Sequence, residues 1–458
     1  MKRINKAIRR IIFPSVFCIA LISGLISPIL SAPKSKQRVG TVPPQYQIFD
    51  IGVVQTGDTA SQGFGVSPSG IAVGRSIRTG GAQAFSWTSG GGIVGLPNLA
   101  GRAFCVSNAA NNSGSIAGTC ASTLFGTSRL PVIWQNGSVF QFPLPAGETL
   151  GDANDINATD VAVGSVNSGS LQRGVIYNGA LATVITQTTS NGSFFQTAFG
   201  INDSGRVIGQ GIDPTNAARN VGIVFDIGSS SAFEVGALPN ANGALAFGIS
   251  NGGHVVGSSM MNQGSGLPFI WTQAGGMTAI PLPTDTTQGS ARAVNSSGWA
   301  VGTASSAFAI PFLYDGTATY RLQDLIPAGT GWDLSMNTSS SALGISDNNI
   351  IVGTGVFNGQ THAYAMVPVA NASVSVGGQI LNAFGSGIRN TRVTISGGNL
   401  PAPMTVTTGS FGYYNFENLP SGLTYTVTVA AKQYTFAQPS QMVTPSANVT
   451  NLNFTAQP

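Results

Sequence analysis

The stretches FGINDSGRVIGQG (199–211) and FGISNGGHVVGSS (247–259) are close copies of one phrase. The phrase recurs five more times, in FGVSPSGIAVG (64–74), FCVSNAANNSGSIAG (104–118), NDINATDVAVG (154–164), RAVNSSGWAVG (292–302) and LGISDNNIIVG (343–353). Each copy has Asn or Ser, two further residues, and then a residue type that tolerates a left-handed backbone. That last residue is, in chain order, Gly70, Gly114, Asp160, Gly205, Gly253, Gly298 and Asn349. The pattern predicts a tight β-hairpin built on a type I turn followed by a left-handed residue.

Each hairpin is followed by a second apolar run, such as PFIW (268–271), and in six copies by a fourth segment ending in Leu or Ile. Four short strands in about 45 residues are typical of a propeller blade. The seventh copy lacks its fourth strand, whereas YQIFDIG (46–52), which resembles YRLQDLI (320–326), precedes the first copy. We therefore expect an all-β chain with a seven-bladed β-propeller over residues 46–370, closed by its N-terminal strand so that no edge strand is exposed.

Two stretches at the start of the third strands, THAYAM (361–366) and QAF (83–85), carry a family resemblance. With the repeated hairpin, they resemble the extracellular HAF repeat family, named for a His-Ala-Phe run, although other copies have Pro or Gly before the aromatic residue. The resemblance covers about residues 46–368 and implies an exported, propeller-like protein, with motifs that belong to the repeat and not to catalysis.

Residues 371–458 have a different pattern, with short strands such as SVSVGGQI (373–380) and YTVTVAA (425–431) separated by turns. This predicts a small β-sandwich of the Ig-like or prealbumin-like type. GIRNTRVTISG (387–397) and FGYYNFENLPSG (411–422) are similar to the carboxypeptidase regulatory-like domain. That resemblance implies a non-catalytic appendage of an exported protein.

Residues 1–32 begin with basic residues and continue with the apolar run IIFPSVFCIALISGLISPIL (11–30), which predicts a secretory signal peptide followed by a linker over 33–45. A retained membrane anchor is the alternative. Five of the 20 Lys and Arg residues lie in this leader, so the rest of the chain nearly balances its 16 acids and does not have the charge of a nucleic-acid-binding protein. We expect a monomer without a further membrane span, either secreted or located at the cell surface or in the periplasm.

The sequence contains few candidates for chemistry. Of the two histidines, His254 is interpreted as a surface residue and His362 as part of the repeat framework. The stretch DANDINATD (152–160) has alternating oxygen-bearing side chains but lacks the central Gly and distal Glu of a calcium loop. We therefore expect no catalytic set, no metal and no cofactor.

Cys105 and Cys120 are the two cysteines outside the leader. Counting outward from the turn NNSG (111–114) places the two cysteines opposite each other on the hairpin. Aligning the repeats on their leading Phe residues instead places Cys105 at Gly65 and Cys120 at Ser76, two positions that are not opposite each other. We favour a disulfide, as expected in an exported protein, over two free thiols.

The loops between second and third strands, and the connectors between repeats, vary most in length and composition. Since binding specificity often resides in variable loops on a rigid scaffold, we predict an extracellular glycan or protein ligand on this face, contacted by Arg219, Asp285 and Trp332. The alternatives are a propeller-based polysaccharide lyase or hydrolase, and a purely structural envelope or adhesion component.

Overall fold

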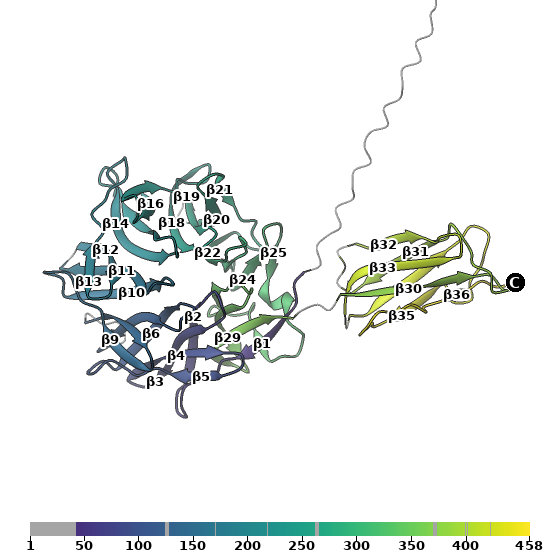
Figure 1. The fold of residues 1–458 in the computed structure, drawn as a ribbon, viewed down its shortest axis with the longest axis horizontal. Helices are drawn as coiled ribbons and strands as arrows, with labels where there is room; N and C mark the ends of the chain where they lie inside the picture. The colour runs from purple at the N-terminus through teal and green to yellow at the C-terminus, as the bar shows by residue number, and fades with distance from the viewer. Residues whose placement is uncertain are drawn as a thin grey trace, which may run out of the picture. The chain divides into compact units, whose positions relative to one another are not determined.

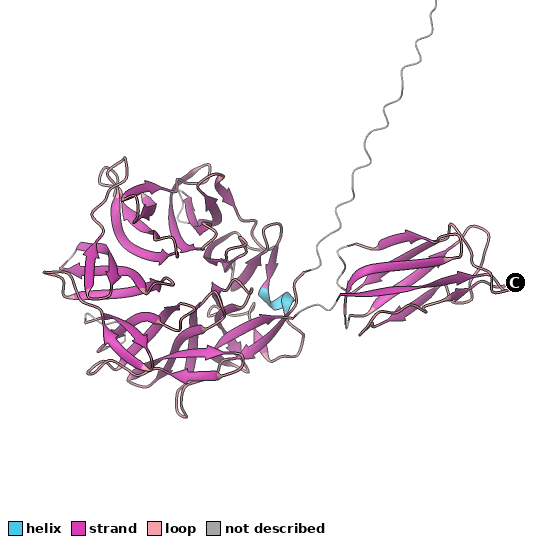
Figure 2. Cartoon of the chain, viewed as in Figure 1, coloured by secondary structure: helices cyan, strands magenta, loops and turns pink. Residues whose placement is uncertain are grey.

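The computed structural model describes residues 43–458 apart from 124–127, 170, 218, 262–264, 370–372, 399, 401 and 422. The predicted signal peptide lies outside the described residues, as does most of the predicted linker. The described chain is almost entirely β-structure, and its one helix is the short 3-10 helix η1 (Leu322–Leu325) (Figure 2). None of the described segments forms a helix long and apolar enough to cross a membrane.

Within each repeat the strands pair antiparallel with their neighbours in the chain. The third to sixth repeats form separate four-stranded sheets, whereas the first two are joined into one eight-stranded sheet by a parallel pair, Ala82 opposite Phe104. The first two contain β2 (Ala60–Val66), β3 (Ala72–Arg78), β4 (Gly81–Thr88) and β5 (Gly92–Gly95), then β6 (Phe104–Ala110), β7 (Ile116–Ala121), β8 (Leu130–Gln135) and β9 (Ser138–Gln141). The third and fourth contain β10 (Leu150–Ile156), β11 (Val161–Ser168), β12 (Leu171–Asn178) and β13 (Leu181–Val184), then β14 (Phe194–Ile201), β15 (Arg206–Ile212), β16 (Asn220–Asp226) and β17 (Ser231–Glu234). The fifth and sixth contain β18 (Ala241–Ile249), β19 (Val255–Met261), β20 (Gly266–Thr272) and β21 (Gly276–Ala279), then β22 (Gln288–Val294), β23 (Ala300–Ser305), β24 (Ala309–Tyr314) and β25 (Thr319–Arg321).

The last repeat forms a sheet from β27 (Ser341–Ile345), β28 (Ile351–Phe357) and β29 (Gln360–Pro368), to which β26 (Trp332–Asp333) adds a short pairing with β28. Its outer strand is β1 (Tyr46–Asp50), which pairs antiparallel with β29 from Tyr46 opposite Pro368 to Asp50 opposite Tyr364. The predicted pairing of the segment 46–52 with the last repeat is therefore present.

Neighbouring sheets pack face to face and are arranged around a common centre (Figure 1). The first strand of each repeat contacts the first strand of the next, from β2 through β6, β10, β14, β18 and β22 to β27, and β27 in turn contacts β2. The hydrophobic clusters lie between sheets: one of them joins Phe85 and Trp87 of the first sheet to Val352 and Ala363 of the last. Because each sheet buries both faces in this way, the chain is all-β and propeller-like.

The C-terminal part forms a β-sandwich with a hydrophobic core of its own, which includes Val376, Phe416 and Val427. One sheet has the order β33–β30–β36 and the other the order β32–β31–β34–β35. The strands are β30 (Ser373–Leu381), β31 (Arg392–Gly397), β32 (Met404–Thr407), β33 (Tyr413–Pro420), β34 (Tyr425–Ala430), β35 (Ser440–Val443) and β36 (Phe454–Thr455).

Candidate functional site

The repeated phrase forms the hairpin between the first and second strands of each propeller sheet. In the fourth repeat, Asn202 Oδ1 accepts hydrogen bonds from the backbone N–H of Arg206 at 2.9 Å and from Ser204 Oγ at 2.8 Å. A side chain that bonds to its own turn in this way stabilises the turn locally. All seven residues predicted to be left-handed have positive φ: Gly70, Gly114, Asp160, Gly205, Gly253, Gly298 and Asn349. The repeated phrase is thus explained by turn geometry.

The first strand of every repeat also carries a β-bulge, at which one residue has no partner on the second strand. The bulged residues are Phe64, Asn108, Asn154, Phe199, Phe247, Arg292 and Leu343. A glycine of the second strand faces each bulge; at Gly257, for example, an added Cβ would lie 1.8 Å from the Leu245 carbonyl oxygen. Bulges re-aim side chains, and all seven bulged residues line a single pocket at the centre of the first strands.

The pocket has a volume of about 240 Å³, and one side of it is aromatic. The Phe199 and Phe247 rings lie 5.7 Å apart between centroids. The guanidinium of Arg292 stacks 4.2 Å above the Phe247 ring, a cation–π contact. Arg292 is exposed and makes no hydrogen bond or ion pair with the part of the chain that the structure describes. Its donors are available to a ligand.

The opposite side of the pocket is polar. Asn108 Nδ2 donates to the Ala153 carbonyl at 2.8 Å, and Asn154 Nδ2 donates to the Ala198 carbonyl at 2.9 Å. These bonds to the next sheet hold both amides in place. Each Oδ1 has no donor among the described residues and is left as an acceptor facing the pocket.

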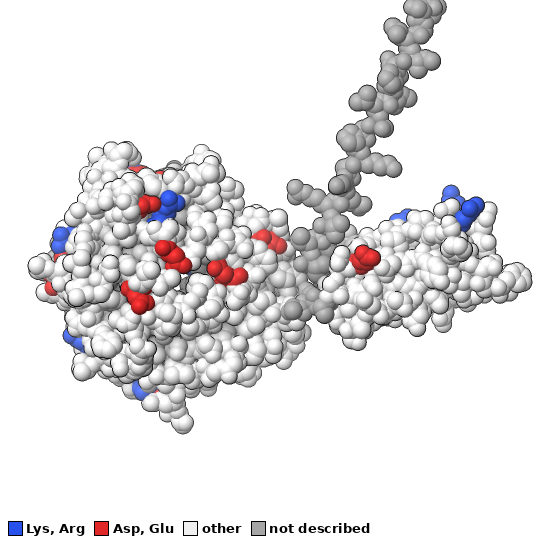
Figure 3. All heavy atoms as spheres, viewed as in Figure 1, with Lys and Arg blue, Asp and Glu red and all other residues white. Residues whose placement is uncertain are grey.

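The turns form the rim of the pocket. Asp203 Oδ1 accepts from the Ala158 N–H at 2.8 Å, and Asp347 Oδ1 accepts from the Ser296 N–H at 2.8 Å. Figure 3 shows acidic side chains gathered around the centre of the propeller on this face. The rim is therefore acidic, and Arg292 is the one cation among the pocket-lining residues.

Asp155 is a third carboxylate in the pocket wall. It follows the bulge of β10 at a position where the other repeats have only Gly or Ala. Its two oxygens accept from the backbone N–H groups of Ile156 and Ile201, each at 2.8 Å. Burial raises the pKa of Asp155 to about 7, because desolvation outweighs these two hydrogen bonds.

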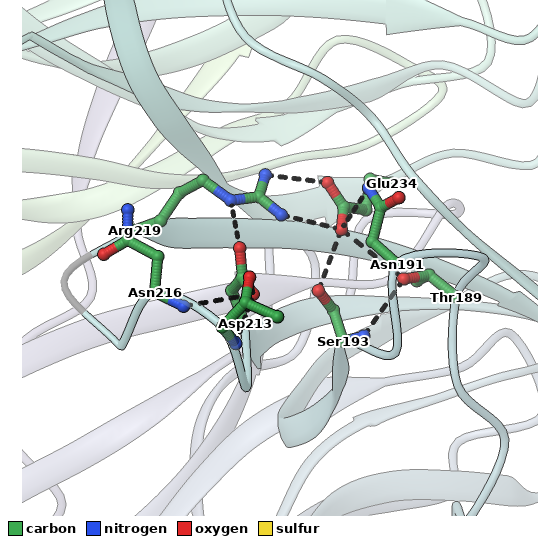
Figure 4. A network of polar contacts seen from close by, with 8 residues as sticks. Thr189, Asn191, Ser193, Asp213, Asn216, Arg219 and Glu234 are labelled. Atoms are coloured by element: carbon green, nitrogen blue, oxygen red, sulfur yellow. Dashed lines mark hydrogen bonds and ion pairs between the residues drawn. The ribbon is translucent and has the colours of Figure 1, made fainter.

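Arg219, predicted to contact a ligand, takes part in an ion-pair network within its own repeat (Figure 4). Its Nε lies 2.7 Å from Asp213 Oδ2, and its terminal nitrogens lie 2.8 and 2.9 Å from the Glu234 oxygens. Glu234 Oε1 also accepts from Ser193 Oγ at 2.8 Å. Hydrogen bonds from Thr215 and Arg219 hold the pKa of Asp213 below its usual value, and Arg219 does the same for Glu234. The guanidinium of Arg219 is therefore paired with two carboxylates of its own repeat.

The other two predicted ligand contacts lie in different parts of the chain, Asp285 in the connector between β21 and β22 and Trp332 in β26. Asp285 is 89% exposed at its side chain and forms an ion pair with Arg321 at 3.2 Å. Trp332 is only 7% exposed and packs against Phe357 and Tyr364 at centroid distances of 4.9 and 5.8 Å. No contact given by the described residues brings Arg219, Asp285 and Trp332 together, and Trp332 is a core residue.

The predicted disulfide between Cys105 and Cys120 is present, and the two residues lie directly opposite on β6 and β7. The alignment on the leading Phe residues was wrong, because Phe104 is not the counterpart of Phe64. The second hairpin has the same length as the others, so Cys105 and Cys120 take the positions of Ser61 and Ser76, which also pair. The counterpart of Phe64 is Asn108.

The two histidines have structural contacts. His254 Nδ1 lies 3.4 Å from Ser250 Oγ within its own turn, and His362 Nδ1 lies 2.9 Å from Asp50 Oδ1. Within the described ranges, no group of three or more His, Cys, Asp or Glu side chains is placed to hold a metal ion.

Sequence reasoning missed the bulged residues as a group. Aligning the repeats on the turn Asn or Ser, instead of on the leading Phe, would have shown a variable column of large or polar residues between two columns of mostly small ones. That column, from Phe64 to Leu343, forms the pocket.

Comparison with known proteins adds one family match. Residues 367–457 match the model of the carboxypeptidase regulatory-like domain, in agreement with the predicted C-terminal domain. No curated protein sequence matches the chain.

Several solved structures are similar to the propeller. One is YCF48 bound to D1 peptide, with 10% identity, coverage of 72% of this chain and 99% of that chain, and a TM-score of 0.42. TolB from Acinetobacter baumannii has 9% identity, coverage of 69% and 65%, and a TM-score of 0.38. The β-propeller domain of the Trilobed protease from Pyrococcus furiosus has 12% identity, coverage of 70% and 94%, and a TM-score of 0.37.

Proposed function

We propose that the chain is an exported, non-catalytic binding protein of the extracellular HAF repeat type. In this proposal a seven-bladed propeller, closed by β1, takes one unit of an extracellular glycan in the pocket at its centre. The observation that carries the proposal is the ring of bulged residues, since the bulge turns one side chain per repeat into the pocket. The ring closure is supported by the pairing of β1 with β29 and by the contact of β27 with β2.

The chemistry of the pocket suits a sugar ring. Phe199 and Phe247 are only partly buried, so the parts of the two rings that Arg292 does not cover offer apolar surface to the C–H face of a pyranose, as aromatic side chains do in ligand pockets. The free Oδ1 atoms of Asn108 and Asn154 can accept hydrogen bonds from sugar hydroxyls. Arg292 can donate to a hydroxyl or carboxylate oxygen.

The pocket lies at the short hairpins, and not among the variable loops between second and third strands. Arg219 and Trp332 are occupied by contacts within the protein, which favours the central pocket. The surface formed by the variable loops is the second candidate docking site. Asp285 belongs to it and has an exposed side chain.

The test is binding of the full chain to a glycan array and a peptide array. The variants are Phe247→Ala and Arg292→Gln in the pocket, with Asp285→Asn as the matched control on the variable loops. We expect binding to glycans, a loss of about tenfold or more in affinity for each pocket variant, and no change for the control.

Three results would overturn the proposal. Peptide binding that both pocket variants abolish would keep the site and change the ligand class. Binding reduced by Asp285→Asn alone would move the site to the variable loops. Release of cleaved glycan would place the protein among the lyases or hydrolases.

A further inference from the structure

One end of the C-terminal sandwich carries an unusual set of exposed side chains. β30 runs from Ser373 to Leu381 and ends at this loop end, which also contains the turns after β32 and β34. The loop end is thus formed by residues 382–391, 408–412 and 431–439, and it lies opposite Ser373, where the sandwich begins.

Two phenylalanines project from adjacent turns at the loop end. Phe384 is 92% exposed and Phe411 is 76% exposed. Their turns are held beside each other by β30, because Gln379 Nε2 donates to the Phe411 carbonyl at 2.8 Å and the Ile380 N–H donates to the Gly412 carbonyl at 2.9 Å. Exposed apolar side chains that are held together on one surface are a mark of an interaction surface.

The same end is basic. Arg389, Arg392 and Lys432 are exposed, and none of them forms an ion pair within the described part of the chain. Glu417 is the single acidic residue in 373–458. It lies on β33, within reach of Asn415 Nδ2 at 3.2 Å. In Figure 3 the basic side chains visible on the sandwich lie apart from its acidic side chain.

We propose that this loop end docks the protein on an anionic phospholipid surface. Phe384 and Phe411 enter the interfacial layer, and Arg389, Arg392 and Lys432 lie against the lipid phosphates. Charge complementarity identifies the partner, because three cations without an ion pair among the described residues lie at the same end of the sandwich as two highly exposed apolar side chains. Apolar insertion combined with electrostatic attraction is the general basis of interfacial binding. This attachment is independent of the ligand in the propeller pocket.

The test is co-sedimentation of the full chain with vesicles of phosphatidylcholine alone and of phosphatidylcholine mixed with phosphatidylglycerol. We expect binding to the mixed vesicles only, weakened by salt because exposed charges are screened. The double variant Phe384→Ser/Phe411→Ser should lower the vesicle affinity about tenfold or more. The double variant Arg389→Gln/Lys432→Gln should lower the affinity at low salt and reduce its dependence on salt.

The matched control is Phe140→Ser, since Phe140 is an exposed phenylalanine of the propeller, and its vesicle binding should be unchanged. The proposal is overturned if the full chain does not bind the mixed vesicles, or if the Phe384/Phe411 variant binds them as well as the original chain. It is also overturned if a soluble anionic polysaccharide is bound at the cationic residues while vesicles are not.

Discussion

His362 Nδ1 lies 2.9 Å from Asp50 Oδ1, although the two residues are 312 positions apart in the chain. The contact joins β29 to β1, next to the backbone pair formed by Asp50 and Tyr364. His362, which belongs to the repeat pattern of the last sheet, therefore also helps to keep β1 paired with β29.

Removal of this contact should loosen β1 more than any other strand. For His362→Ala we expect a loss of about 1 kcal/mol or less, as for a partly exposed ion pair, and up to about fivefold faster amide exchange in β1. Hydrogen exchange followed by mass spectrometry measures this. His254→Ala, at the other histidine, should leave exchange in β1 unchanged. Equal acceleration in all sheets would show that His362 does not act through β1.

The turn residues of successive repeats form a partial ladder of buried side chains. The amide Nδ2 of Asn202 donates to the Ser250 carbonyl at 3.1 Å, and that of Asn295 donates to the Ser346 carbonyl at 3.2 Å. Ser67, Ser250 and Ser346 stabilise their own turns through Oγ but have no amide to reach the next repeat. The ladder is interrupted at these three serines.

Substitutions between Asn and Ser should therefore act in opposite directions. Asn202→Ser should lower the free energy of unfolding by about 1 kcal/mol, the net value of one hydrogen bond, and Ser250→Asn should raise it by a similar amount. Urea unfolding monitored by tryptophan fluorescence measures both. Ser138→Asn, at an exposed position of β9, serves as the control and should have no effect. A destabilising Ser250→Asn would mean that the next turn is out of reach.

The hairpins could be predicted from the sequence because their determinants are local. Asp160 and Asn349 stand in the left-handed position that Gly occupies elsewhere, and the type of residue alone identifies such a position. The segment 46–52 could be assigned to the last sheet because a spare strand and a missing strand complement each other.

The pocket could not be predicted in the same way. A bulge depends on how two strands pair, so Phe247 and Arg292 read as ordinary strand residues when the repeats are aligned on their leading Phe. Trp332 was predicted as a ligand contact because it lies in the variable connector 325–341, whereas its burial against Phe357 depends on the packing of β26 on β28. Arg219 looks like an unpaired loop cation until Asp213 and Glu234 are brought beside it.

The disulfide should stabilise the second sheet. It closes a loop across a sequence separation of 15 residues, for which chain entropy predicts about 3 kcal/mol. Reduction with a thiol should lower the unfolding temperature of the original chain, as measured by calorimetry. The double variant Cys105→Ser/Cys120→Ser should unfold at the lower temperature with or without the thiol. A double variant as stable as the oxidised chain would contradict this account.

Asp155 should make the stability of the propeller depend on pH near neutrality. Its pKa of about 7 in the folded chain lies above the ordinary value of 3.8 for an Asp side chain, so the folded state holds the proton more tightly than the unfolded state does. Between these two values the folded chain binds more protons, and its stability falls as the pH rises from about 4 to about 7. Above that range the contribution of Asp155 no longer changes.

Asp155→Asn removes the titration and keeps an oxygen acceptor for only one of the two backbone N–H groups, those of Ile156 and Ile201. The variant is therefore less stable at every pH, and only the slope with pH is compared. We expect the fall in unfolding free energy between about pH 4 and 7 to be smaller in this variant, as measured by urea unfolding at several pH values. Asp324→Asn, an exposed carboxylate on η1, should keep the slope of the original chain. If the unfolding free energy of Asp155→Asn falls with pH as steeply as that of the original chain, the carboxyl group of Asp155 is ionised throughout the range from about pH 4 to 7. The hydrogen bonds from its two backbone donors would then outweigh the cost of burial.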